Sequence, residues 1–288
     1  KNDNVYLFNR GNNPVIVLDP NGELLRTWGR GVFKNPHGAH IGFDDCIYLT
    51  DNGDHTVRKF TLDGRLLLEI GVPGRSSGFM SGAPFCHCTH SALSPECNIL
   101  VSDGYGNAAI HEFDPNGKYI KSWGEPGTGL GQFNLPHNIC CDTDGWIYVA
   151  DRENSRIQIF DQKGNYEKQL GNIHRPSGLA ITPGSNPDLL VGELAPYLQV
   201  NKHFPNLGPF FSIIDQQNRI LFRLGDKGKA GLMPGQFVSP HSIAYDSKGN
   251  LYVGDVVETD WEQVFGNLTK PKSIRRFQKF ERYGDWVR

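Results

Sequence analysis

Ile-Tyr-Leu-Thr-Asp, at residues 47–51, is a short apolar strand that ends in an acid, and its recurrence decides the fold. Close copies and two looser versions of this phrase stand at residues 99–103, 147–151, 251–255, 5–9 and 189–193. The last residues of the six copies are spaced between 42 and 62 residues apart. Self-similarity at this period predicts a repeat architecture in which each copy is one strand of a structural unit.

A hairpin follows this strand in each unit. Residues 18–22 read Leu-Asp-Pro-Asn-Gly and residues 113–117 read Phe-Asp-Pro-Asn-Gly, and each leads into a strand that ends in Trp-Gly. Asn-Gly between apolar strands indicates a tight hairpin in which both turn residues take positive φ. Six units of about four short strands each predict an all-β fold, a six-bladed β-propeller that fills residues 1–288 as one domain.

Two features depart from the regular repeat. Unit one begins at its second strand, so we expect the first blade to lack its innermost strand in the chain given. The wider spacings of units five and six indicate long loops at about residues 194–212 and 256–272. Insertions in repeats usually lie on one face, where they often shape a site.

The composition excludes several functional classes. The formal net charge is −2, from 29 basic and 31 acidic residues that are well mixed, which argues against a nucleic-acid partner. No stretch approaches the ~20 apolar residues that a membrane span needs, so we expect no membrane partner. The six cysteines match no zinc ribbon, and a chain of this length needs no disulfides, which favours reduced thiols.

Three histidines share one position in alternate units. His37, His137 and His241 each stand fourteen residues before the final acid of their unit, and each follows a proline. Units three and five have Thr89 and Ser177 at the aligned position. Alternate blades of six are about 120° apart around a propeller axis, so the three imidazoles should converge. Three neutral imidazoles with an open fourth position are the ligands of a catalytic zinc. In the alternative reading, Pro-His is a turn whose imidazole caps backbone groups.

Loops that follow the repeated strands should return to the face of the histidines. They supply Arg10, Arg152 and Tyr105. An arginine beside a metal suits a substrate carboxylate, because its planar fork binds two oxygens at once. A tyrosine beside a metal-polarised hydroxyl can act as a general base. The alternative for Arg152, a salt bridge to Glu153 or Asp151, is favoured over a substrate contact.

Four stretches resemble one known family. Residues 5–11, 102–107, 131–138 and 149–154 are similar to those of peptidyl-α-hydroxyglycine α-amidating lyases, which are propellers built from NHL repeats. The resemblance implies a zinc lyase that cleaves the C–N bond of a hydroxylated C-terminal glycine, on a peptide or a smaller molecule, and releases an amide and glyoxylate. It implies one zinc per chain on His37, His137 and His241, Tyr105 as the base, and Arg10 as its partner and a substrate contact.

The chain departs from the family at several positions. Ser239 replaces a methionine two residues before the last zinc histidine, so one wall of the substrate pocket should be more polar. Ser242 replaces an aspartate that holds a structural calcium, which argues against calcium here. Cys86 matches one cysteine of the family's two disulfides, but Gly106, Tyr148 and Ile159 stand at the other positions.

Two other functional classes remain open. A propeller hydrolase such as a lactonase also uses one divalent metal, usually a calcium held by carboxylate and Asn oxygens. A non-enzymatic NHL scaffold would bind a peptide or RNA on one face, and the aligned histidines would then have no role.

Overall fold

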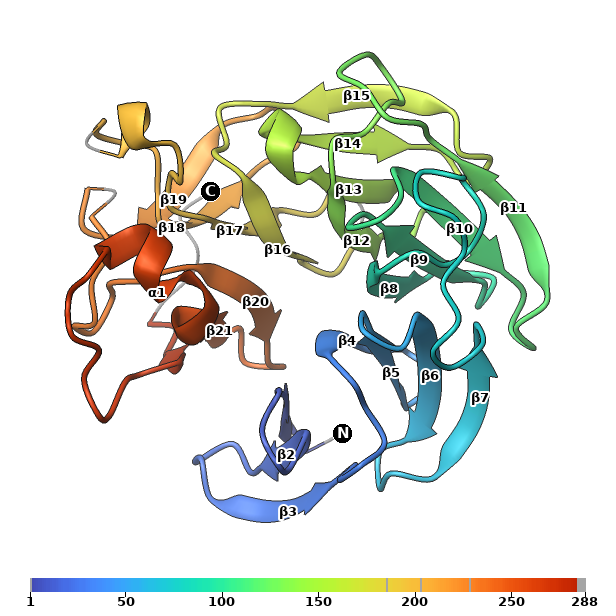
Figure 1. Ribbon diagram of the computed structural model, residues 1–288, viewed down its shortest axis with the longest axis horizontal. Coiled ribbons are helices and arrows are strands. Elements are labelled where there is room, and N and C mark those ends of the chain that lie inside the picture. Colours follow the sequence, from blue (N-terminus) through green and yellow to red (C-terminus); the bar gives the residue numbers. More distant parts are fainter. Residues whose placement is uncertain (1, 185, 203, 228, 284–288) are drawn as a thin grey trace. The chain divides into compact units, whose positions relative to one another are not determined.

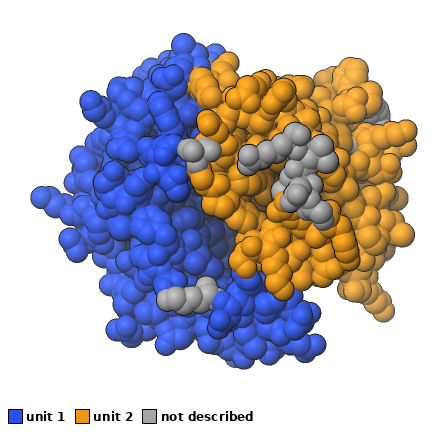
Figure 2. Space-filling model, turned by 180° about the vertical axis from the view of Figure 1, so that it is seen from behind, with its two compact units in different colours: residues 1–149, 159–167 blue, residues 150–158, 168–288 orange. Residues whose placement is uncertain are grey.

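The chain is built of short antiparallel strands. In this computed structural model, residues 2–184, 186–202, 204–227 and 229–283 are described, and they form six sheets. Contacts divide the chain into two compact units: unit 1 comprises Lys1–Val149 and Ile159–Glu167, and unit 2 comprises Ala150–Gln158 and Lys168–Arg288 (Figure 2). The all-β class and the six blades of a β-propeller, expected from the repeat, are confirmed (Figure 1).

The sheets follow one another along the chain. Blades one to three contain β1 (Val5–Phe8), β2 (Val15–Leu18), β3 (Leu24–Trp28), β4 (Pro36–Ile41), β5 (Cys46–Asp51), β6 (Thr56–Thr61), β7 (Leu66–Ile70), β8 (Cys88–Leu93), β9 (Ile99–Asp103), β10 (Ala109–Phe113) and β11 (Tyr119–Trp123). Blades four to six contain β12 (Pro136–Cys141), β13 (Ile147–Asp151), η1 (Arg152–Asn154), β14 (Arg156–Phe160), β15 (Tyr166–Leu170), β16 (Pro176–Ile181), β17 (Leu189–Glu193), η2 (Gln199–Asn201), β18 (Phe210–Ile214), β19 (Ile220–Leu224), β20 (Pro240–Tyr245), β21 (Leu251–Asp255), α1 (Val257–Phe265) and β22 (Phe277–Phe280).

The first blade has three strands, as the sequence predicts, because β1 corresponds to the second strand of the other blades. The sixth blade also has three strands among the described residues, β20 to β22. The two predicted insertions carry η2 in blade five and α1 in blade six.

The core lies between neighbouring blades. All residues of β9 and β10 are buried, whereas the outer strand β11 is mostly exposed. One apolar cluster joins Leu100 and Ile110 of blade three to Ile147, Val149 and Phe160 of blade four. Blades therefore pack face to face through their middle strands, which explains why these strands are apolar on both sides.

The Asp-Pro-Asn-Gly hairpins differ from the tight two-residue turn that the sequence indicates. Only the glycine has positive φ, +93° at Gly22 and +82° at Gly117. Gly22 N–H donates to Asp19 O at 3.0 Å, and the strand register shifts after the turn. This is a type I turn closed by a left-handed glycine and a bulge. The aspartate stabilises it, because the Asp19 carboxylate accepts the amide hydrogens of Asn21 and Glu23.

The acid that ends each repeated strand ties down the loop before the inner strand. Asp51 accepts the amide hydrogens of Lys34 (2.7 Å) and Asn35 (2.9 Å), just before β4. Asp103 does the same for Cys86 at 2.8 Å, and Asp255 for Val238 at 2.9 Å and Ser239 at 2.5 Å. Glu193, the blade-five equivalent, accepts the amide hydrogen of His174 at 2.8 Å. We call Asp51, Asp103, Asp151, Glu193 and Asp255 the anchor acids.

Four anchor acids also face a basic side chain of their own blade, which comes from the third strand in blades two to four and from the fourth strand, β19, in blade five. The pairs are Arg58–Asp51 (3.6 Å), His111–Asp103 (3.1 Å), Arg156–Asp151 (2.7 Å) and Arg223–Glu193 (2.8 Å). These four acids are at most 1% exposed. A buried carboxylate requires such partners, because removing one partner of a buried pair costs about 3–5 kcal/mol.

Asp255 generates a prediction about pH. Burial, followed by the nearby Asp260, raises its pKa to about 6. When a carboxyl has a higher pKa in the folded state than in the unfolded state, the free energy of unfolding falls as pH rises from about 4 to 6. The reason is that the folded state binds the proton more tightly than the unfolded state, and this proton is lost over that range. We expect Asp255→Asn, which cannot ionise, to gain unfolding free energy relative to wild type over this range, by up to about 3 kcal/mol.

Urea unfolding of both proteins at pH 4, 5, 6 and 7 measures this difference. The substitution also weakens one amide contact by a constant amount, so the slope with pH is the test. A difference that does not change between pH 4 and 7 would contradict the raised pKa.

The six cysteines form no disulfide among the described residues. Gly106 stands at one of the positions where the resemblance implies a cysteine, and a Cβ there would lie 2.3 Å from Cys86 Sγ. Burial raises the pKa of Cys140 to about 12, and that of Cys88 is also raised by burial. These two thiols should therefore react slowly in the folded protein.

We expect a thiol titration in denaturant, without reductant, to find six free thiols, and a titration of the folded protein to find fewer reacting at once. Prior reduction should leave the denatured count unchanged. A count of two or fewer before reduction, rising to six afterwards, would show that the thiols are paired.

Candidate functional site

The inner strands carry a β-bulge at their second residue. In β4 the pairing with β5 shifts between Pro36 and Gly38, so His37 is the extra residue. The same shift puts Thr89 of β8 and His241 of β20 at the bulge. A bulge turns a side chain away from the regular alternation of its strand and is common next to functional sites. The bulge therefore gives His37 and His241 the same local backbone geometry in two blades.

Glycines bring the inner strands of unit 1 close together. A Cβ at Gly38 would lie 2.6 Å from Thr89 O, and one at Gly104 would lie 2.2 Å from Pro136 O. Any larger residue at either place would push the neighbouring blade away. Gly104 directly precedes Tyr105, so its close approach places the tyrosine loop against the start of β12, where His137 follows Pro136.

His37, Tyr105 and His137 form one cluster in unit 1. Tyr105 Oη lies 3.2 Å from His37 Nε2 and 3.0 Å from His137 Nε2. The two imidazole centroids are 5.0 Å apart, and the ligand nitrogens of the two rings lie within 4.8 Å of each other. The sequence-predicted base and two of the predicted metal ligands therefore meet at one point.

The hydrogen bonds of His37 fix its tautomer. Its Nδ1 is 2.6 Å from Thr89 O, and a carbonyl oxygen only accepts, so Nδ1 carries the hydrogen. Nε2 of His37 therefore presents a lone pair to the Tyr105 hydroxyl. An imidazole whose Nδ1–H is held by a backbone carbonyl is the usual form of a metal-ligating histidine.

The donor set fits a borderline-soft cation such as zinc. Both Nε2 atoms lie within hydrogen-bond distance of the Tyr105 oxygen, and the lone pair of His37 Nε2 can serve as a metal ligand. Imidazole nitrogen suits zinc, whereas calcium and magnesium prefer oxygen ligands.

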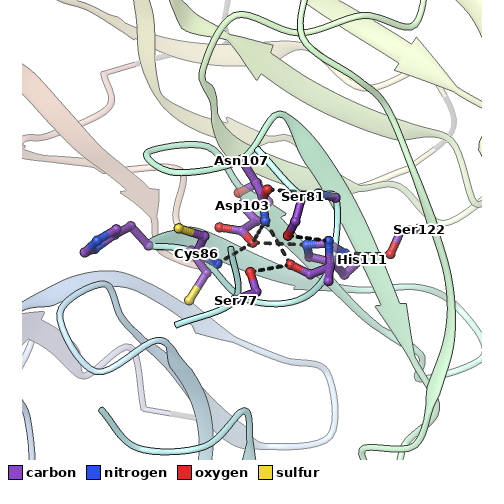
Figure 3. A network of polar contacts seen from close by, with 12 residues as sticks. Ser77, Ser81, Cys86, Asp103, Asn107, His111 and Ser122 are labelled. Carbon is purple, nitrogen blue, oxygen red and sulfur yellow. Dashed lines mark hydrogen bonds and ion pairs between the residues drawn. The ribbon is translucent and has the colours of Figure 1, made fainter. Parts of the chain in front are cut away.

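A polar network holds the Tyr105 loop in place (Figure 3). Asp103 Oδ2 accepts hydrogen bonds from Cys86 N (2.8 Å), Asn107 Nδ2 (2.8 Å) and His111 Nε2 (3.1 Å). Asn107 Oδ1 in turn accepts the amide hydrogen of Gly82 at 3.1 Å. The network ties the loop before β8 to the loop that carries Tyr105. It escaped the sequence reasoning, although the aligned acid at 103 was a signal for it.

Arg10 lies beside the start of β4. Its Nε donates to Pro36 O at 3.2 Å, next to His37, and the residue is exposed. The structure therefore brings Arg10 to the strand that carries one candidate ligand, as the sequence expects of a residue near the site.

Arg152 and Ser239 are engaged within unit 2. Arg152 Nε donates to Glu153 Oε1 at 2.8 Å, which matches the salt bridge favoured from the sequence over a substrate contact. Glu153 also pairs with Arg175 at 2.8 Å. Ser239 is 0% exposed, and its hydroxyl donates to Asp260 of α1. The Ser239 hydroxyl therefore faces this carboxylate.

Asp260 was missed by the sequence reasoning, because it lies in an insertion with no repeated register. It also accepts a hydrogen bond from Tyr197 Oη in the blade-five insertion. Burial, together with Asp260, raises the pKa of Tyr197 to about 12. The guanidinium of Arg175 lies 4.0 Å from the Tyr197 ring centroid. The two insertions of unit 2 therefore pack through buried polar contacts.

Two further histidines near His37 are neutral. Burial lowers the pKa of His40 to about 4 and that of His90 to about 3. They are polar core residues that add no charge beside the cluster.

Several known proteins are similar in sequence to this chain. The NHL repeat family matches residues 133–160. Peptidyl-glycine alpha-amidating monooxygenase B of Xenopus laevis is 31% identical over 84% of this chain and 27% of its own length. Peptidyl-alpha-hydroxyglycine alpha-amidating lyase 1 of Drosophila melanogaster is 28% identical over 90% of this chain and 50% of its own length. The chain thus spans between about a quarter and a half of these relatives.

Among solved structures, a protein of unknown function from Bacteroides caccae aligns with a TM-score of 0.64. The alignment covers 95% of this chain and 88% of that one at 17% identity, which supports the fold alone. No helix among the described residues is long and apolar enough to cross a membrane. The repeat and the relatives agree, and the chain belongs to the peptidyl-α-hydroxyglycine α-amidating lyase-like family of NHL-repeat propellers.

Proposed function

We propose that this protein is a zinc-dependent lyase that cleaves the C–N bond of an α-hydroxylated amide or amine. The substrate would resemble a peptidyl-α-hydroxyglycine, and the products would be an amide and glyoxylate. The observation that carries the proposal is the convergence of two imidazole Nε2 atoms on the Tyr105 hydroxyl, at 3.2 and 3.0 Å.

The proposed metal ligands are His37, His137 and His241. The three side chains make a group that could hold a metal ion. His241 shares with His37 the preceding proline and the bulge, so the same local backbone presents both rings. When bound, zinc would polarise the substrate hydroxyl as a Lewis acid.

Tyr105 would move the proton in this reaction. As a phenolate, whose own proton has already passed to solvent, it would accept the proton of the substrate hydroxyl, and the electrons of that O–H bond would form the carbonyl of glyoxylate. The C–N bond breaks, and its electron pair stays on nitrogen, which takes up the proton. The atoms balance without a further reactant. The Asp103 network holds the Tyr105 loop, so the phenol is positioned before substrate arrives.

Arg10 would bind the substrate carboxylate. Its side chain is exposed and lies beside Pro36, so a carboxylate at the cluster could accept from its guanidinium. Arg152, which already pairs with Glu153, would contribute less to substrate binding.

The donor chemistry ranks the alternative functions lower. A calcium hydrolase needs carboxylate and amide oxygens around its metal. The unit 1 cluster offers two imidazoles and a phenol instead. A binding scaffold does not need a histidine whose Nδ1–H is held so that Nε2 is presented.

Metal analysis tests the centre directly. We expect about one equivalent of zinc per chain in protein purified without chelators, and little or none in His137→Ala, because one ligand is lost. His87→Ala removes an exposed imidazole outside the cluster and should keep the full equivalent. Elemental analysis of the three proteins measures this. A full equivalent of zinc in His137→Ala would overturn the ligand assignment.

Kinetics test the role of Tyr105. Tyr105→Phe keeps the ring and deletes the hydroxyl, so kcat toward a peptidyl-α-hydroxyglycine should fall about 10²–10⁴-fold while zinc content stays at the wild-type level. The matched control is Tyr119→Phe, on the outer strand β11, which should change kcat less than two-fold, or about 0.4 kcal/mol. If Tyr105→Phe turns over within a few-fold of wild type, Tyr105 is not the base.

A further inference from the structure

Two histidines outside the cluster contact each other in unit 1. His55 lies in the turn between β5 and β6 and is buried, whereas His87 is exposed in the loop before β8. Their ring centroids are 4.4 Å apart. Both have a left-handed backbone, with φ of +57° and +58°, which is uncommon for residues other than glycine. Each loop is therefore held in a specific conformation where the two histidines meet.

The contact between them determines the protonation state of His55. The backbone N–H of His87 donates to His55 Nδ1 at 3.1 Å. A backbone amide only donates, so Nδ1 is the ring nitrogen without a hydrogen. The His55 imidazole is therefore neutral and carries its hydrogen on Nε2. A protonated ring has a hydrogen on both nitrogens and cannot accept this bond.

The carbonyl of His87 holds the loop that carries the candidate base. His87 O accepts the backbone N–H of Tyr105 at 3.4 Å and the side-chain amide of Asn52 at 3.3 Å. The Nδ1–H of His87 donates back to Asn52 O at 3.1 Å. The backbone of a single residue therefore joins the His55 ring on one side to Tyr105 on the other.

A second contact between the same two loops does not involve His55. Met80 N–H donates to Gly106 O at 2.7 Å, one residue beyond Tyr105. The loop before β8 therefore contacts the Tyr105 loop at two places, and His55 holds the one at the tyrosine itself. Because the phenol lies between two imidazoles, a small shift of this backbone moves its oxygen away from them.

We propose that His55 is a positioning residue for Tyr105: its neutral imidazole holds the His87 amide, and the His87 carbonyl holds the backbone of Tyr105. The inference rests on the proposed function and deepens it, because it adds a residue that sets the geometry of the base. His55 acts through His87, so protonation of His55 releases one contact of the Tyr105 loop.

The surroundings of His55 determine the pH at which this contact is lost. The charged or titratable groups that act on it are His87, Asp103, Asp54 and Asp51. Burial, followed by His87, lowers the pKa of His55 from its ordinary value of 6.5, although the three carboxylates oppose this. Arg58 pairs with Asp51 and Asp54 and weakens their effect. The folded state thus binds this proton more weakly than the unfolded state, so the contact is complete at neutral pH and is lost as pH falls below 6.5.

Amide hydrogen exchange tests the contact without turnover. The exchange rate of the segment that contains Tyr105, relative to that of the unfolded chain at the same pH, gives its protection. Wild type should lose about 10-fold of this protection between pH 7 and 4.5, because protonation removes a hydrogen bond and leaves the amide of His87 without its acceptor. His55→Asn keeps an oxygen acceptor, tolerates the left-handed backbone and cannot titrate, so its protection should stay within two-fold over this range.

Two further variants complete the experiment. His55→Gly adopts the same backbone without an acceptor, so its Tyr105 segment should be about 10-fold less protected than that of wild type already at pH 7. His174→Asn replaces a histidine of unit 2 whose pKa is also lowered by burial, and it should behave as wild type at both pH values. Wild-type protection in His55→Gly at pH 7, or an equal loss on acidification in His55→Asn and wild type, would overturn the proposal.

Kinetics separate this proposal from the lyase itself. With a peptidyl-α-hydroxyglycine, kcat of wild type should fall more steeply below pH 6.5 than kcat of His55→Asn, and His55→Gly should be several-fold slower than His55→Asn at pH 7. Identical pH profiles of kcat in wild type and His55→Asn would refute the positioning role. No cleavage by any of these proteins would refute the lyase, and hydrogen exchange would still decide whether His55 holds the Tyr105 loop.

Discussion

The anchor acid of each blade is the contact on which the rest of the structure depends. A loop that leads into an inner strand has amide hydrogens with no strand partner, and a buried carboxylate accepts them. Hydrogen bonds to a charged group contribute about 1.5–3 kcal/mol each, and Asp51 accepts two from the loop before β4. The loop is thereby fixed at the two residues that precede Pro36. The position of His37, which follows the proline, is fixed with it.

The bulge at this fixed strand start then sets the direction of the histidine side chain that is the candidate metal ligand. In a regular strand, each side chain points to one face of the sheet, and here such a side chain packs between neighbouring blades. His37 is instead the residue without a backbone partner in the ladder, and its Nδ1–H donates a hydrogen bond to Thr89 O of the neighbouring blade. A proline is compatible with the preceding position, because Pro36 is the first residue of β4, where the strand ladder needs no N–H donor.

Much of this could be predicted from the sequence. The repeated acid predicted the number of blades, and counting back from it to Pro-His identified His37 and His137. The count works because equivalent positions of a repeat occupy equivalent places in their blades. The bulge could not be predicted, since alternation at residues 36–41 looks the same with or without an extra residue. The Asp-Pro-Asn-Gly turn was predicted in place but not in type, because Asn-Gly suits two turns that differ in the φ of one residue. Asp260 had no signal, since an insertion has no register to count from.

Blade three differs from its neighbours in how it uses its anchor acid. In blades two and four the third strand supplies an arginine, and in blade five the fourth strand does, whereas the third strand of blade three supplies His111, a shorter side chain with one nitrogen to donate to the acid. Asp103 Oδ2 also accepts a hydrogen bond from Asn107 Nδ2, and Oδ1 has no hydrogen-bond partner among the described residues. Asn107 is the residue that fastens the loop of Gly82 and Ala83 to the Tyr105 loop. The carboxylate of Asp103, with His111 and Asn107, thereby fixes the loop of Tyr105, whose hydroxyl lies between two imidazoles.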